Sequence, residues 1–169
     1  MQILVTGATG KVGQALLAAL AGRWPGARVR ALLHNRDLPA RPGLETLKGS
    51  LADRSVAKAA VQGCTHVVHL ATCKETPDDV MDVTVKGLFW LLEAWRANPA
   101  AQRFVLIGGD AAVGHFFYDH GGPVTEATPH RAYPGCYALS KVLEETMLTQ
   151  FGIQYGIDWC CLRAPWIME

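Results

Sequence analysis

Residues 2–13 read QILVTGATGKVG, a short apolar run that passes directly into a loop with glycines at 7, 10 and 13. The alanine- and leucine-rich stretch at 11–22 predicts a helix that starts inside this loop. A strand, a glycine turn and a helix in this order are typical of the cradle that holds a dinucleotide pyrophosphate. Gly7 permits a turn too tight for a Cβ, Gly10 lets the backbone approach a phosphate, and Gly13 lets the helix pack on the strand.

The glycine spacing is not the G-x-G-x-x-G form, so the flanking strand and helix carry most of this interpretation. The helix N-terminus would face the negative charge of the ligand. The alternative is a strand-to-helix turn that binds nothing.

Length and composition point to one α/β domain, because 169 residues that are half hydrophobic suffice for a single core. The net charge is +1, and 16 basic and 15 acidic residues are spread along the chain. Neither nucleic acid nor an anionic membrane surface is therefore expected as a partner. No apolar run approaches the roughly 20 residues of a membrane span. The first residues already form a core strand, so we expect no signal peptide and a cytoplasmic location.

The five cysteines include no C-x-x-C pair, and we interpret them as reduced structural thiols. None of the six histidines forms a ligand pair with helical spacing, and no metal site is expected.

Strands and helices alternate along the chain. Apolar, β-branched runs predict strands at 2–5, 27–33, 44–49, 66–71, 103–107 and 158–162. Helical patterns occur at 11–22, 52–62, 78–98 and 137–150, and residues 108–135 form an irregular loop rich in glycine and proline. This order predicts an α/β fold: a doubly wound, Rossmann-like parallel sheet of six strands with helices on both faces.

Tyr137 and Lys141 are four residues apart in YALSK, so a phenol and an ammonium share one helical face. A nearby ammonium favours the phenolate, which would let Tyr137 act as acid or base near neutral pH. Lys141 could also hold the hydroxyls of a nicotinamide ribose. The Y-x-x-x-K pattern alone is weak, since it occurs by chance in many helices.

The whole chain resembles the short-chain dehydrogenase/reductase superfamily, in particular its extended branch of NAD-dependent epimerases, dehydratases and reductases. The motifs that carry this resemblance are 6–13, 69–71, LLEA at 91–94, PVTE at 123–126, 137–141 and LRAP at 162–165. The resemblance implies catalysis by Tyr137 and Lys141, which also contact the cofactor. It implies further cofactor contacts from Gly7, Gly10, Lys11, Val12, Gly13, Ser50, Leu51, Leu70, Ala71, Pro165 and Ile167.

The chain departs from that family after the fifth strand, where a serine or threonine usually binds the reacting oxygen and this sequence has Gly109. Losing such a donor costs roughly 100- to 1000-fold in rate. Asp110 is the candidate replacement, or it only binds backbone amides in a glycine-rich turn. Ser50 stands where the family commonly has an aspartate for the adenine amino group, so adenine binding is expected to be weaker.

The segment after the second strand reads LLHNR, with no carboxylate before Asp37 to accept bonds from an adenosine ribose. Arg36, helped by His34 or Lys11, could instead pair with a 2′-phosphate. NADP is therefore favoured over NAD, and a solvated surface arginine is the alternative.

The sequence ends after the sixth strand, where the family continues into a smaller substrate domain. We expect residues 1–169 to form a dinucleotide-binding domain from which that substrate domain is absent.

Three readings of the function follow from these observations. The first is an NAD(P)-dependent oxidoreductase or nucleotide-sugar epimerase/dehydratase that acts on a small alcohol or carbonyl compound. The second is a cofactor-binding sensor or scaffold with little catalysis, which Gly109 favours and the intact Tyr137–Lys141 pair opposes.

A purely structural dimerisation module is a third reading. It rests on the apolar faces of 78–98, where Met81, Val85, Leu88, Leu92 and Trp95 make one stripe. A homodimer that pairs helices 78–98 and 137–150 with their mates is expected.

Overall fold

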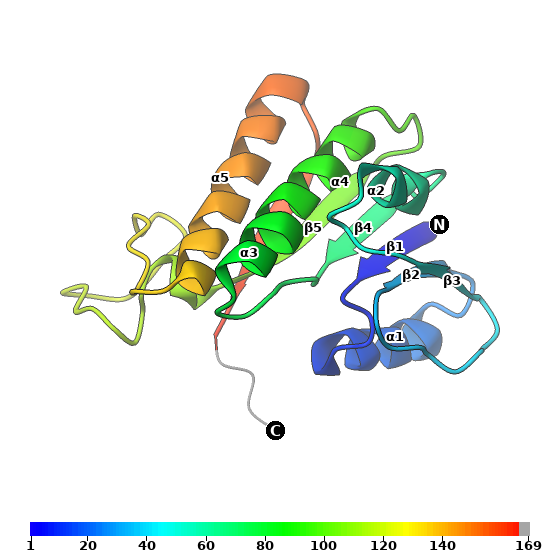
Figure 1. Ribbon diagram of the computed structural model, residues 1–169, viewed down its shortest axis with the longest axis horizontal. Coiled ribbons are helices and arrows are strands. Elements are labelled where there is room, and N and C mark those ends of the chain that lie inside the picture. The colour runs from blue at the N-terminus through cyan, green and yellow to red at the C-terminus, as the bar shows by residue number, and fades with distance from the viewer. Residues whose placement is uncertain (166–169) are drawn as a thin grey trace.

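Six parallel strands form a single sheet in the computed structural model, which describes residues 1–165 (Figure 1). Their order across the sheet is β3-β2-β1-β4-β5-β6. The strands are β1 (Gln2–Thr6), β2 (Arg28–Leu33), β3 (Leu44–Lys48), β4 (His66–His69), β5 (Arg103–Gly109) and β6 (Trp159–Ala164). The predicted Rossmann-like α/β fold is confirmed.

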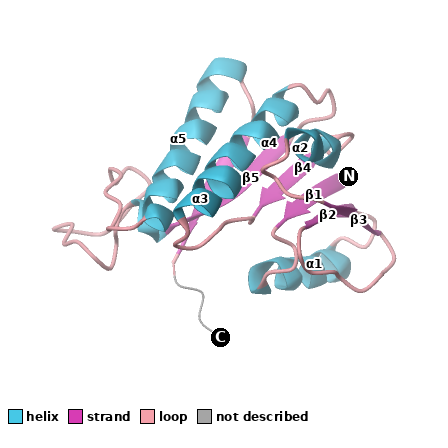
Figure 2. Ribbon diagram, viewed as in Figure 1, coloured by secondary structure: helices cyan, strands magenta, loops and turns pink. Residues whose placement is uncertain are grey.

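Helices cover both faces of the sheet (Figure 2). The helical segments are α1 (Lys11–Arg23), α2 (Arg54–Val61), α3 (Pro77–Asp79), the π-helix η1 (Val80–Val85), α4 (Lys86–Arg96), the 3-10 turn η2 (Asp110–Ala112) and α5 (Cys136–Tyr155). One face carries α1, and the opposite face carries α2, α4 and α5.

Alternating residues of β1 and β2 supply two separate apolar cores. Leu4 of β1 belongs to the core under α2, α4 and α5, whereas Val5 belongs to the core under α1. Within residues 1–165 the α1 core contains no residue of β5 or β6, and Leu162 of β6 is 54% exposed. The α1 face is therefore covered mainly over the half of the sheet formed by β1 and β2.

The predicted long helix at 78–98 is three segments rather than one, because η1 interrupts it. A π-helix has more residues per turn than an α-helix, so the buried face shifts. Val80 and Thr84 are buried, while Met81, which the sequence placed in the apolar stripe, is 50% exposed. Thr84 Oγ1 accepts the Cys73 amide N–H at 2.9 Å and so ties η1 to the segment after β4.

Helix α5 is longer than predicted and ends at Tyr155 rather than Gln150. Gly152 lies within the helix, where the absence of a side chain leaves room for the Trp159 indole. Gly156 caps the end of the helix: its φ of 65° is left-handed, and its N–H donates to the Gly152 carbonyl. Strand β5 also extends two residues beyond its predicted end.

None of the five cysteines, all within residues 1–165, forms a disulfide. Within residues 1–165, no helix is long and apolar enough to cross a membrane.

Candidate active site

The glycine loop between β1 and α1 folds back on itself at the carboxyl edge of the sheet. Gly7 has φ 65°, and its carbonyl accepts the Gly10 N–H at 3.0 Å. A Cβ at Gly7 would lie 2.7 Å from the Leu70 carbonyl carbon, and a Cβ at Gly13 would lie 2.7 Å from Ala8 Cα. These positions therefore accept only glycine, which confirms the tight turn predicted at Gly7 and shows that at Gly13 the helix packs on the loop rather than on the strand.

The N-terminus of α1 opens at this loop. Its N-cap is Gly10, whose lack of a side chain means that no capping bond covers the first turn. The first-turn amides are thus the kind of donors that bind an anion at a helix start.

One cavity of about 340 Å³ joins the glycine loop to the start of α5. It is lined by ten of the predicted site residues, namely Gly7, Gly10, Lys11, Val12, Gly13, Leu70, Asp110, Tyr137, Lys141 and Pro165. The sheet order produces this meeting, because β1 and β5 flank β4 and all strands end at the same edge. A larger open groove of about 650 Å³ lies between α2 and α4 and contains none of the predicted residues.

Five predicted site residues do not line the cavity: His34, Arg36, Ser50, Leu51 and Ala71. Leu51 is 3% exposed and belongs to the apolar core beside α4. Ile167 lies outside the described residues.

The segment after β2 is exposed at His34 and Arg36. Asp37, the first carboxylate after the strand, pairs with Lys48 at 3.1 Å. Ser50 is half-buried, and its hydroxyl accepts the Ala52 N–H at 3.2 Å.

Tyr137 and Lys141 lie on the first turns of α5, and both line the cavity. The Lys141 Nζ is 5.4 Å from the centroid of the Tyr137 ring. A Cβ at Gly109 would lie 3.7 Å from the Tyr137 hydroxyl and 3.8 Å from Lys141 Cγ, both ordinary contacts. The backbone at position 109 therefore has room for a Cβ.

Lys141 does not reach the cavity as an isolated charge. It is 2% exposed, and Nζ donates to Glu144 Oε2 at 2.7 Å, three residues further along α5. Burial raises the pKa of the Glu144 carboxyl, while the Lys141 ammonium opposes that rise. Sequence reasoning missed Glu144, although its i, i+3 spacing from Lys141 is a usable signal.

A buried histidine lies on the other side of Glu144. His69 Nδ1 is 2.9 Å from Thr6 Oγ1, and His69 Nε2 is 3.9 Å from Glu144 Oε1. The N–H groups of Leu70 and Ala71 both donate to Thr6 Oγ1 at 3.2 Å. Burial, and secondarily the charge of Lys141, lowers the pKa of His69 to about 3, so His69 is neutral at physiological pH.

Asp110 begins η2 at the cavity wall. Its Oδ2 is buried, has no hydrogen-bond partner in residues 1–165, and lies 3.9 Å from His115 Nδ1. Asp110 thus brings a carboxylate to the cavity wall beside Gly109.

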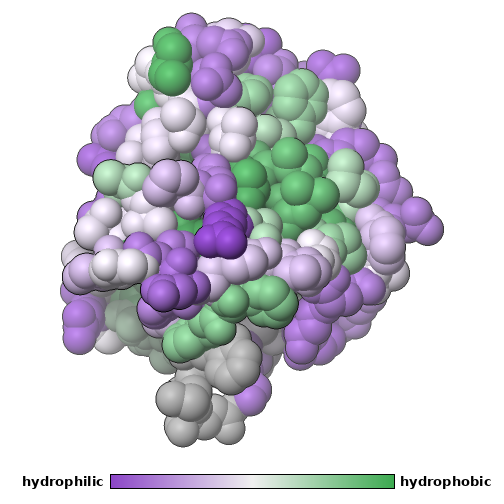
Figure 3. All heavy atoms as spheres, turned by 90° about the vertical axis from the view of Figure 1, so that its left-hand side faces the viewer, coloured by the Kyte–Doolittle hydropathy of each residue, from purple (hydrophilic) through white to green (hydrophobic). Residues whose placement is uncertain are grey.

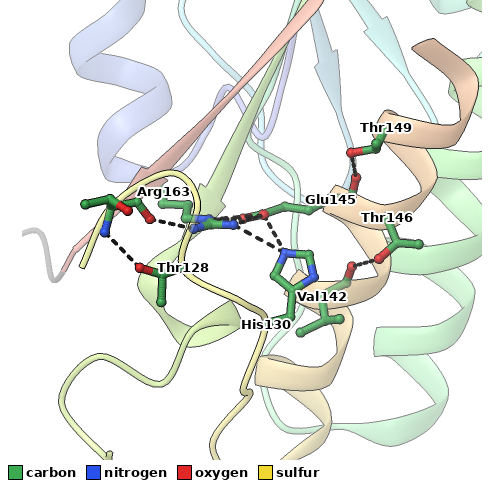
Figure 4. A network of polar contacts seen from close by, with 8 residues as sticks. Thr128, His130, Val142, Glu145, Thr146, Thr149 and Arg163 are labelled. Carbon is green, nitrogen blue, oxygen red and sulfur yellow. Dashed lines mark hydrogen bonds and ion pairs between the residues drawn. The ribbon is translucent and has the colours of Figure 1, made fainter. Parts of the chain in front are cut away.

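A second polar network fastens the long loop after β5 onto α5 and β6 (Figure 4). Glu145 accepts from Arg163 Nη2 at 3.0 Å and lies 2.8 Å from His130 Nε2, and Arg163 Nη1 donates to the Thr125 carbonyl. Burial alone would raise the pKa of Glu145, but the bonds from Arg163 and His130 outweigh it and lower the pKa. Arg163 of this network directly precedes Ala164, which lines the cavity.

Comparison with known proteins gives a consistent family match. The model of the NAD dependent epimerase/dehydratase family matches residues 3–167. A 3 beta-hydroxysteroid dehydrogenase/Delta 5-->4-isomerase of Mycobacterium tuberculosis is 32% identical over 98% of this chain and 47% of its own length. A bifunctional dihydroflavonol 4-reductase/flavanone 4-reductase of Malus domestica is 28% identical over 93% of this chain and 51% of its own length.

A solved structure shares the fold. Uronate dehydrogenase from Agrobacterium tumefaciens, in a complex with NAD, superimposes with a TM-score of 0.82 at 29% identity, over 94% of this chain and 58% of that one. The chain thus spans about half the length of the curated relatives it matches.

Proposed function

The chain belongs to the NAD dependent epimerase/dehydratase family, and from that premise we propose that its cavity binds NADP or NAD for oxidoreductase or epimerase/dehydratase chemistry. The observation that carries this proposal is the single cavity that joins the glycine loop to Tyr137 and Lys141. Phosphate-binding and proton-transfer groups are thereby brought to one place from opposite ends of the sequence.

The residues present fit a dinucleotide. The glycine loop is a cradle that side chains at Gly7 or Gly13 would fill, and the uncapped α1 N-terminus suits a pyrophosphate. The residues that would hold the cofactor are those of the loop, with Leu70 and Pro165 on the adjoining wall.

NADP is the favoured cofactor. Arg36 and His34 are exposed beyond β2, where a 2′-phosphate would bind, and the nearest carboxylate, Asp37, is paired with Lys48. An arginine fork suits a phosphate, whereas NAD is favoured by a free carboxylate at this place.

When bound, the nicotinamide supplies hydride transfer. Tyr137 holds or moves the proton at its phenolic oxygen, and Lys141 favours the phenolate through its charge. Asp110 brings a carboxylate to the same cavity, where the chain has no hydroxyl at Gly109. The substrate is a small alcohol or carbonyl compound, with nucleotide sugars as one class.

A second candidate function, dinucleotide sensing with little catalysis, is favoured by Gly109. Such a protein would bind the cofactor through the same loop without turnover.

The test is calorimetric titration of the chain with NADP and with NAD. We expect NADP to bind at least as tightly as NAD, and Arg36→Ala to weaken NADP roughly tenfold or more while sparing NAD, because a charge-assisted bond is lost. Arg28→Ala, at the other end of β2, is the matched control, and Tyr137→Phe should bind as the unchanged chain does. Failure of a folded sample to bind either cofactor at millimolar concentration would overturn the proposal. Equal losses for both cofactors would refute the role of Arg36.

A further inference from the structure

Glu144 is an ionisable side chain whose place in the core is costly. It is 0% exposed, and only one of its oxygens has a partner, since Oε1 lacks a hydrogen bond within residues 1–165. Replacing a buried ion pair by apolar residues of similar volume is often neutral or stabilising. Stability therefore does not explain why a carboxylate stands here.

The location of Glu144 suggests an electrostatic reason. Its Oε2 holds Lys141 Nζ at 2.7 Å, and that ammonium lies 5.4 Å from the Tyr137 ring. A carboxylate this close offsets the charge of the ammonium, so the phenol is influenced by the pair rather than by a lone cation.

His69 lies on the far side of the Glu144 carboxylate. Thr6 Oγ1 accepts two amide N–H groups, so its own hydrogen points to His69 Nδ1, and the ring proton of His69 is then on Nε2. That N–H faces Glu144 Oε1 across 3.9 Å. A row of neighbouring polar side chains, Thr6, His69, Glu144 and Lys141, thus extends from the start of the glycine loop to Tyr137.

We propose that Glu144 is a positioning residue, which fixes the Lys141 ammonium against the interior and sets how strongly it acidifies Tyr137. This inference rests on the proposed roles of Tyr137 and Lys141. The loss of Glu144 would leave the ammonium uncompensated and make the Tyr137 phenol a stronger acid.

Other charged or titratable groups surround these side chains. Tyr133 lies near Tyr137, Glu75 and Asp110, and the Glu75 carboxylate accepts the Tyr137 amide N–H at 3.4 Å. Glu145 and Cys161 lie near Glu144, from α5 and β6. Glu144→Gln removes none of these side chains, and Glu145 and Cys161, which interact electrostatically with Glu144, are not the groups that contact Tyr137.

The experiment is a titration of the four tyrosines, labelled at Cζ and followed by NMR, with Tyr137 assigned by its loss in Tyr137→Phe. Glu144→Gln should lower the pKa of Tyr137 by about one pH unit, the size typical of a neighbouring charge. Tyr155, at the far end of α5, should not move. Glu145→Gln is the matched control. It removes a carboxylate charge from the neighbouring residue, but that carboxylate binds Arg163 rather than Lys141.

A second variant covers the case in which Glu144→Gln does not fold. Lys141→Met leaves the carboxylate without its cation and should raise the pKa of Tyr137 above that of the unchanged chain. An unchanged Tyr137 pKa in both variants, or an equal shift in Glu145→Gln, would overturn the inference and leave Glu144 a structural role. Titration of NADP into the same samples separates the two proposals, because a chain that binds no dinucleotide can still show the Tyr137 shift.

Discussion

His69 shows how a single buried side chain can shape the pH dependence of the whole protein. Its pKa is lowered to about 3 in the folded chain, whereas an unfolded histidine titrates near about 6.5. Between these values the unfolded chain binds the extra proton, so stability rises with pH across this window and falls as pH decreases through it.

We therefore expect the free energy of unfolding to fall by up to about 1.4 kcal/mol per pH unit below about pH 6.5 through His69 alone. His69→Asn keeps an acceptor for the Thr6 hydroxyl and removes the titration, so the loss between pH 7 and pH 5 should be smaller in the variant. Urea denaturation at several pH values measures this difference. Equal slopes in both proteins would show that His69 is not the group responsible.

At the level of elements, α1 contains two glycines whose surroundings differ sharply. A Cβ at Gly13 would press on the backbone of Ala8, whereas a Cβ at Gly22 would meet nothing within 4 Å. Both glycines lie in the helix, so alanine has the same intrinsic advantage at each.

Gly22→Ala should stabilise the chain by up to about 1 kcal/mol. Gly13→Ala should lower the unfolding midpoint and weaken dinucleotide binding by tenfold or more, because the loop must shift from the helix. Thermal unfolding with and without NADP checks both variants. Normal cofactor binding by Gly13→Ala would contradict the close approach described for this loop.

The elements also show which features could be predicted from the sequence. The glycine loop and the Tyr137–Lys141 pair are each contiguous, so their residue types and spacing were sufficient to place them. The π-helix was not foreseen, because residues 78–98 have the composition of one continuous α-helix. Thr6 and His69 come from two strands, so their link to Glu144 depends on β1 and β4 being neighbours.

On the scale of the molecule, one side carries a hydrophobic patch surrounded by polar residues (Figure 3). This view faces the left-hand side of Figure 1, where the loop of residues 113–135 projects beside α5. Met81, Phe89 and Leu139 of η1, α4 and α5 are 50%, 37% and 51% exposed. Apolar side chains on neighbouring helices support the proposed homodimer.

We expect light scattering to show a dimer at micromolar concentration and Leu139→Glu to shift it to monomer, because a charge would be buried at the seam. Trp24→Glu, a 53% exposed position at the end of α1, should leave the dimer intact. A strict monomer in the unchanged chain would remove the proposal.

The sheet order has a consequence for folding. β1 pairs with β2 on one side and with β4 on the other, where Thr6 is opposite His69, 63 residues away. The sheet thus consists of two flanks, residues 2–48 and 66–164, which meet where β1 pairs with β4. A contact between residues so far apart in sequence forms slowly during folding. The glycine loop and Leu70 meet where β1 and β4 end, at the carboxyl edge of the sheet. A dinucleotide bound there would contact both flanks in the folded chain only. The free energy of unfolding should therefore rise with the dinucleotide concentration.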